Sequence, residues 1–186
     1  MKNTKNLLKQ IQQCKDCPLC NNQNPLLDKK IKADVMWVGL SAVKVECTIK
    51  EAPLSKSTNT GKLISEIENI NNGIEFYKTN LVKCLPLKDE KIRYPKQEEM
   101  KSCFNHLKTE IVEFKPKLVF LLGKQVIDFI ADKKDINFSD KFDYKPYLKD
   151  NITYVPVHHP SYILVYKRKN IHSYVDSINK IINTFI

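Results

Sequence analysis

The spacing of the cysteines restricts the fold of this chain more than any other sequence feature. Cys14 and Cys17 are separated by two residues, a gap that lets both thiolates reach one metal centre. Cys84 and Cys103 lie in mid-chain, so folding must bring them to the first pair if all four are ligands. An iron–sulfur cluster suits this arrangement, and a zinc ion is the rival. Either centre would hold the N-terminal segment against the middle of the chain.

The remaining cysteines, Cys20 and Cys47, leave the choice of ligands open. Cys20 follows Cys17 at the spacing that separates Cys17 from Cys14, so these three also imitate the start of a ferredoxin-type run. Asn24 stands where the fourth cysteine of such a run would fall. Buried free thiols would explain any single cysteine, but they fit the close first pair poorly.

Length and composition exclude several classes of protein. The chain has 186 residues, 42% of them hydrophobic, which suffices for one sizeable core and excludes a mostly disordered protein. We therefore expect a single domain over residues 1–186. The start lacks an apolar signal core, and no stretch approaches the roughly 20 apolar residues of a membrane span. We therefore expect a cytoplasmic protein without a membrane partner, and we also expect a monomer. The formal net charge of +10 favours a polyanionic partner such as nucleic acid.

Short apolar runs alternate with amphipathic segments along the chain. The apolar runs predict strands at residues 35–39, 76–82, 117–123 and 152–157. Apolar residues at three- and four-residue spacing predict helices at residues 61–70, 96–114, 125–131 and 171–182. The segment 132–149 is weakly periodic and reads as a surface excursion. Alternating strands and helices predict an α/β fold of three layers, with helices on both faces of a central, mostly parallel four-stranded sheet.

Polar residues gather where three of the predicted strands end. Gly39-Leu40-Ser41 follows the first strand, Asn80 lies near the end of the second, and His158-His159-Pro160-Ser161 follows the fourth. Each group alone is explained by turn or packing chemistry. Ligands of open α/β sheets, however, bind outside the carboxyl ends of the strands. In the predicted sheet the three groups therefore face one cleft.

Several motifs occur in an order that has a known parallel. They are Cys14-Lys15-Asp16-Cys17-Pro18-Leu19, Asn80-Leu81-Val82-Lys83-Cys84-Leu85-Pro86, the Pro95 to Cys103 segment, Leu122-Gly123 and Val157-His158-His159-Pro160-Ser161. In this order they resemble the iron–sulfur branches of the uracil-DNA glycosylase superfamily, families 4 and 5. The resemblance implies the uracil-DNA glycosylase fold and hydrolysis of the bond between a base and its deoxyribose in DNA. It also implies a structural 4Fe-4S cluster, with Cys14, Cys17, Cys84 and Cys103 as its ligands.

The resemblance implies roles for further residues. His159 would donate a hydrogen bond to the base carbonyl oxygen on which negative charge develops, and Asn80 would read the base edge. His158 would point elsewhere and pack. Substrate contacts are expected from Gly39, Leu40, Ser41, Asn59 and Ser161, and DNA contacts from Lys83, Tyr162, Lys167 and Arg168. Thr60 is expected to cap the helix that starts near Gly61 rather than to line the pocket.

The first catalytic motif departs from both branches. Leu40 stands where family 4 has an acid that positions water, and leucine neither accepts a proton nor orients water. Gly39-Leu40 resembles family 5, but residues 57–61, comparable to the acidic segment of that family, contain no acid. The water-activating residue is therefore Glu46, Glu51 or absent. Uracil need not be the preferred base, and the alternative is a nucleic-acid-binding module of the same fold with weak or no catalysis.

Overall fold

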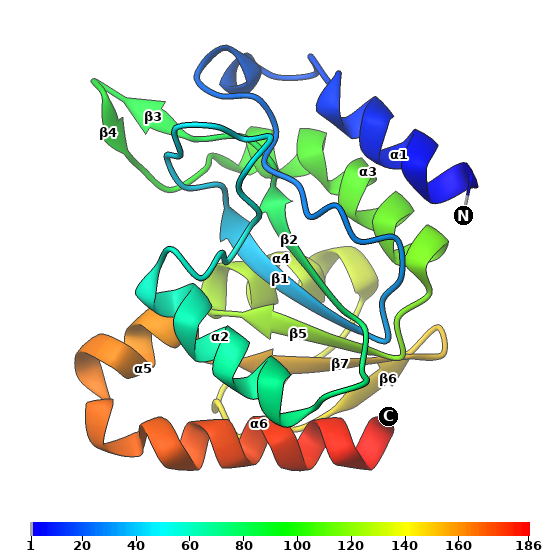
Figure 1. Ribbon diagram of the computed structural model, residues 1–186, viewed down its shortest axis with the longest axis vertical. Coiled ribbons are helices and arrows are strands. Elements are labelled where there is room, and N and C mark those ends of the chain that lie inside the picture. The colour runs from blue at the N-terminus through cyan, green and yellow to red at the C-terminus, as the bar shows by residue number, and fades with distance from the viewer. Residues whose placement is uncertain (1) are drawn as a thin grey trace.

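The structure is a computed structural model that describes residues 2–186 (Figure 1). Its strands are β1 (Val35–Ser41), β2 (Phe76–Val82), β3 (Leu87–Lys88), β4 (Lys91–Ile92), β5 (Leu118–Leu122), β6 (Tyr147–Lys149) and β7 (Ile152–Val157). Its α-helices are α1 (Lys2–Gln12), α2 (Asn59–Ile70), α3 (Gln97–Phe114), α4 (Lys124–Lys134), α5 (Pro160–Tyr166) and α6 (Ile171–Phe185). Two short 3₁₀ helices are η1 (Pro18–Asn21) and η2 (Arg168–Asn170).

The main sheet has the strand order β2-β1-β5-β7-β6. Its first four strands run parallel, and β6 pairs antiparallel with β7 at the edge. The predicted α/β class and the mostly parallel sheet are confirmed, but the predicted number of four strands is wrong, because the sheet has five. The added strand β6 is three residues long, too short to show an alternating pattern. A separate hairpin of β3 and β4 lies outside this sheet.

Alternate residues of the central strand β1 enter two different cores, which makes the fold three-layered. Val35 and Trp37 pack with residues of α2 and α6, and the Trp37 ring is stacked on Phe120 at 4.5 Å between centroids. Met36 and Val38 point to the opposite face and pack with residues of α3 and α4. Helices α2, α5 and α6 therefore cover one face, α3 and α4 cover the other, and α1 packs on α3 (Figure 1). Both faces of the parallel strands are buried, as their continuous apolar sequences require.

The parallel register gathers the carboxyl ends of the strands at one edge. Gly39 of β1 is paired with Asn80 of β2, and Leu122 of β5 is paired with Val157 of β7. The segments that follow these residues consequently emerge side by side. Helix α5 starts immediately after the last strand, at Pro160, a residue well suited to the first turn of a helix. None of the helices in residues 2–186 is long and apolar enough to span a membrane.

Candidate functional site

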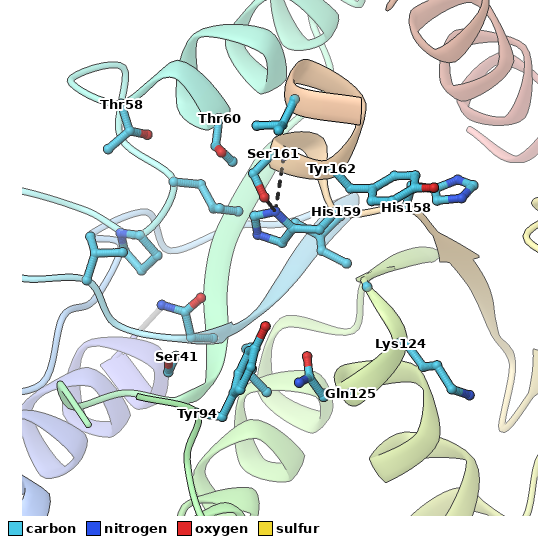
Figure 2. Close-up of a pocket in the computed structure, with 18 of the residues that line it drawn as sticks. Ser41, Thr58, Thr60, Tyr94, Lys124, Gln125, His158, His159, Ser161 and Tyr162 are labelled. Carbon is cyan, nitrogen blue, oxygen red and sulfur yellow. Dashed lines mark hydrogen bonds between the residues drawn. The ribbon is translucent and has the colours of Figure 1, made fainter. Parts of the chain in front are cut away.

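A cleft of about 830 Å³ lies at the carboxyl edge of the sheet. Of the residues with a predicted catalytic, substrate or DNA role, six line it (Figure 2): Leu40, Ser41, Asn80, His159, Ser161 and Tyr162. The strand ends and α5 thus bring Asn80 and His159 to the same cavity although they are 79 positions apart. Further walls come from the loop before α2 and from the start of α4, which contributes Lys124 and Gln125.

His159 is held by the helix that it begins. It is the N-cap of α5, and its Nδ1 accepts a hydrogen bond from the Ser161 backbone N–H at 3.2 Å. The Ser161 hydroxyl lies 2.7 Å from the same nitrogen. Because a backbone N–H can only donate, Nδ1 carries no proton, and the proton of the neutral ring sits on Nε2. Burial lowers the pKa of His159, which favours this neutral form.

Asn80 has an environment that suits ligand recognition. Its side chain is only 4% exposed, yet its carboxamide makes no hydrogen bond to any other residue within 2–186. Its amide atoms are not among the fully buried unpaired side-chain atoms of residues 2–186, so its donor and acceptor face the cleft and are available to whatever enters it. Gly39, its neighbour in the sheet, does not line the cleft itself, but a Cβ at this position would collide with the Asn80 Oδ1. Glycine at position 39 therefore makes room for the carboxamide.

The loop before α2 differs from the prediction. Thr58, not Thr60, caps α2, because its hydroxyl accepts a hydrogen bond from the Gly61 N–H at 3.0 Å. Thr60 instead lines the cleft, whereas Asn59 is exposed and does not. The predicted substrate contact of Asn59 is thus wrong. The helix begins two positions earlier than expected, at Asn59, so Thr60 lies in its first turn and lines the cavity, whereas Asn59 is exposed.

Among the described residues that line the cleft there is no carboxylate. Glu46 is exposed and outside the cleft, and Glu51 accepts a hydrogen bond from the Ser57 hydroxyl at 3.3 Å. Neither acid therefore sits where it could orient water against a bound base. The walls near Leu40 are instead aliphatic, hydroxylic or amidic, including Leu54 and Thr60.

The segment between α4 and β6 contributes two aromatic residues that the sequence analysis missed. Phe142 lines the cleft, and its ring is stacked on that of His158 at 4.2 Å between centroids. The Tyr144 hydroxyl lies 2.8 Å from the Nδ1 of His158, and the Tyr174 hydroxyl donates to the His158 carbonyl oxygen at 3.1 Å. His158 is therefore fixed in an aromatic wall of the cleft. The only sequence signal was the recurrence of aromatic residues in a segment without helical or strand period.

Lys83 does not lie at the surface. Its side chain is 1% exposed, and its Nζ is within 2.6 Å of a Glu110 carboxylate oxygen on α3. The same ammonium group donates to the Thr79 hydroxyl and to the Asn80 carbonyl oxygen, both at 2.6 Å. The predicted DNA contact of Lys83 is wrong, because a buried carboxylate on a distant helix, invisible in the local sequence, draws the lysine inward.

The other predicted DNA contacts lie at the surface. Tyr162 is partly exposed on α5, and Lys167 and Arg168 are exposed in the segment that follows it. Ile163, the residue after Tyr162, is buried and packs in the core below α5. Of the two, only Tyr162 is available at the mouth of the cleft.

A second, much smaller cavity is lined by five cysteines. They are Cys14, Cys17, Cys20, Cys84 and Cys103, all with free thiols. Burial raises the pKa of Cys84 to about 12 and that of Cys14 to about 11, and neighbouring thiols contribute in the same direction. Such a density of soft sulfur donors, from the segment 14–20, the loop after β2 and α3, is typical of a metal centre. Cys47 does not line this cavity.

Two further groups stand next to the cysteines. Ligand atoms of Cys14, Asp16 and His106 lie within 4.8 Å of one another and form a possible metal site of mixed donors. Burial lowers the pKa of His106, so its ring is neutral and can act as a ligand. The residues present therefore fit a metal centre, while both Cys20 and His106 extend the set of possible ligands beyond the four expected cysteines.

Comparisons with known proteins agree with this arrangement. The sequence profile of the Uracil DNA glycosylase superfamily matches residues 22–183. A Type-4 uracil-DNA glycosylase of Archaeoglobus fulgidus is 27% identical over 144 residues, which cover 75% of this chain and 69% of that protein. The crystal structure of wild-type Pedobacter heparinus SMUG2 superimposes with a TM-score of 0.53 at 11% identity, covering 99% of this chain and 84% of that one. The last comparison shows a shared fold.

Proposed function

Because this chain belongs to the uracil-DNA glycosylase superfamily, we propose that it is a DNA glycosylase that hydrolyses the N-glycosidic bond of uracil or another altered base. The observation that carries the proposal is the joint exposure of Asn80 and His159 to one cleft at the carboxyl edge of the sheet. The cleft is large enough for a nucleobase extruded from a DNA strand. The relative named a Type-4 uracil-DNA glycosylase supports the same reaction.

His159 stabilises the leaving base in this proposal. When the bond between the base nitrogen and C1′ breaks, its electron pair goes to the base, and negative charge develops on a base carbonyl oxygen. The Nε2–H of the neutral imidazole donates a hydrogen bond to that oxygen, while Nδ1 stays bound to the Ser161 N–H. One preorganised donor of this kind is worth about 3 kcal/mol of transition-state stabilisation. Water then bonds to C1′ and gives up its proton to solvent or to the departing base.

Asn80 selects the base. Its free donor and acceptor can pair with adjacent carbonyl and N–H groups of a pyrimidine edge, and a base that leaves them unpaired pays for their burial. Leu40, Ser41, Thr60 and Ser161 complete the surroundings of the base. This lining combines aliphatic and hydroxyl groups, so it suits a base other than uracil as well as uracil.

The lack of a carboxylate among the described cleft residues favours a second candidate function. In the first candidate, stabilisation of the leaving nucleobase carries the reaction, and no side chain acts as a general base that activates water. In the second, the chain is a base-binding module of the same fold that has lost catalysis. Incubation with single-stranded oligonucleotides that bear uracil or other altered bases separates the two. Alkali-labile abasic sites identify the enzyme, and retention of the oligonucleotide without them identifies the binding module.

The five-cysteine cavity is proposed to hold a 4Fe-4S cluster on Cys14, Cys17, Cys84 and Cys103. Such a cluster would crosslink the N-terminal segment, the end of β2 and α3. The resemblance to iron–sulfur glycosylases supports iron over zinc, which four cysteines could hold equally well. Purified protein should therefore be brown, with absorption near about 400 nm and matching iron and sulfide contents. A colourless protein that contains zinc would remove the cluster from the proposal.

A further inference from the structure

Four aromatic rings form a ladder that leads out of the cleft. The aromatic ladder consists of Phe142, His158, Tyr162 and Tyr166, all of which line the cleft. The His158 ring is stacked on Phe142 with 4.2 Å between ring centroids. It is also stacked on Tyr162, with 5.0 Å between centroids and an angle of only 7° between the His158 and Tyr162 rings. Tyr162 is followed by Tyr166 at 5.4 Å and a tilt of 40°. Figure 2 shows the Tyr162 and His158 rings side by side beyond Ser161.

The inner and outer ends of the aromatic ladder differ in exposure. Phe142 and His158 are half-buried and held in place, the latter by the Tyr144 hydroxyl. Tyr162 is 38% exposed and Tyr166 is 72% exposed. The two tyrosines are four residues apart on α5 and therefore share one face of the helix. An exposed tyrosine buries little surface in the folded chain, so packing of the core does not explain the outer rings.

Positively charged residues follow the aromatic ladder in the sequence. Lys167, Arg168 and Lys169 directly follow Tyr166, and all three are exposed. None of the ion pairs found within residues 2–186 involves them. Their charges are therefore free to contact phosphates without first breaking an internal pair. Exposed aromatic rings beside unpaired cations are the combination with which proteins hold unpaired nucleic acid strands.

We propose that the aromatic ladder is a stacking platform for the nucleobases next to the extruded base, and that it makes single-stranded DNA the preferred substrate. This inference rests on the proposed function and adds the strand state of its substrate. In a duplex the faces of the neighbouring bases are already stacked, whereas an unpaired strand can turn them onto Tyr162 and Tyr166. The basic residues after α5 then hold the backbone of the same strand.

A binding experiment without any reaction tests the platform. Fluorescence anisotropy measures the affinity of the full chain for an unmodified single-stranded oligothymidylate and for a hairpin duplex of similar length. Tyr162→Ala and Tyr166→Ala should each weaken single-strand binding about tenfold and leave duplex binding nearly unchanged. Tyr→Phe at either position should retain binding because the ring is kept. Tyr→Leu should lose it, because leucine has bulk but no π face.

Phe185→Ala is the matched control. Phe185 is also 38% exposed but lies near the end of α6, outside the residues that line the cleft, and its removal should change neither affinity. The proposal fails if the alanine variants bind the single strand like wild type, or if they lose affinity for the single strand and the duplex equally. It also fails if wild type binds the duplex as tightly as the single strand. Retained binding in Tyr→Leu indicates an apolar wedge and also overturns it. Excision is measured separately, so a protein that shows these losses but releases no base contradicts the proposed reaction alone.

Discussion

At the residue scale, one hydrogen bond decides what His159 can do. The Ser161 N–H occupies Nδ1, so the proton of the neutral ring is placed on Nε2. The same bond starts α5, which means that the residue proposed to stabilise the leaving base is also a structural cap. A histidine with its position and tautomer fixed in this way needs little reorganisation during the reaction.

The pH dependence of base release should report on this histidine. Burial lowers the pKa of His159, so the neutral donor persists below the ordinary value of about 6.5 for histidine and is lost only at lower pH. We expect single-turnover release to stay level from neutral pH down past about 6.5 and then to fall as the ring is protonated. His159→Gln should slow release and abolish this acidic fall, as measured by rate against pH. A fall centred above the ordinary histidine value would contradict the assignment.

Individual positions also show where sequence reasoning reaches its limit. The polar residues at the ends of the strands could be assigned to one cleft because parallel strands share a carboxyl edge. Asn59 and Thr60 could not be distinguished, since the helix start is uncertain by one or two residues and its position decides which side chain faces the cavity. The resemblance implies a DNA contact for Lys83, and the sequence shows no sign of its burial because its partner Glu110 lies 27 positions away.

At the scale of elements, β2 and α3 are joined by a buried polar network. Glu110 accepts hydrogen bonds from the Tyr77 hydroxyl at 2.9 Å and the Thr79 hydroxyl at 3.0 Å, in addition to its ion pair with Lys83. Lys83 in turn donates to the Asn80 carbonyl oxygen, and its backbone N–H donates to the Cys103 sulfur at 3.3 Å. The network thus lies between the cysteine cavity and the strand that bears Asn80.

Breaking this ion pair on one side should be costly. Lys83→Met leaves the Glu110 carboxylate buried without its cation, and we expect a loss of about 3–5 kcal/mol in the free energy of unfolding. The double variant Lys83→Met with Glu110→Leu should recover part of that loss, because neither charge is then buried alone. Urea denaturation of the double variant and of each single variant, Lys83→Met and Glu110→Leu, measures the difference in the free energy of unfolding. A double variant less stable than the sum of both single changes would contradict this view of the network.

Element prediction succeeded for most of the long helices and strands and failed for the short ones. Strands β1, β2, β5 and β7 and helices α2, α3, α4 and α6 were predicted at nearly their observed positions. The prediction did not include the seven-residue α5 and the three-residue β6, neither of which is long enough to display its period, nor the 11-residue α1. Tertiary partners define both short elements: β6 pairs with β7, and the His159 cap starts α5.

At the scale of the whole molecule, the cysteine cavity joins the N-terminal segment to the middle of the chain. If the proposed ligand set is right, Cys103→Ser should lose the absorption near about 400 nm and most of the bound iron. It should also lower the unfolding temperature, because a crosslink between distant segments is lost. Cys47→Ser, outside the cavity, is the control and should retain both. Cys20→Ser tests whether Cys20 is a ligand in place of Cys14. If Cys20→Ser loses its iron while Cys14→Ser retains it, the proposed set of Cys14, Cys17, Cys84 and Cys103 is contradicted.

The net charge of +10 should appear in the salt dependence of DNA binding. Each phosphate contact contributes about −0.7 to the slope of log affinity against log salt for a single strand. Lys167→Ala and Arg168→Ala should each reduce the magnitude of that slope by about this amount. The control is Lys180→Ala, an exposed lysine on α6 that does not line the cleft, so the slope should not change. Unchanged slopes in the Lys167 and Arg168 variants would remove the segment after α5 from the DNA interface.

The single domain over residues 1–186 stays a prediction, as do the monomeric state and the cellular compartment.

The central claim is that Asn80 and His159 act together on one extruded base. Its most direct test is release of free base from single-stranded oligonucleotides that carry a panel of altered bases. Wild type should produce alkali-labile sites with at least one base, and His159→Ala should do so about a hundredfold more slowly or worse with its circular dichroism unchanged. Equal release by wild type and the variant would contradict the account.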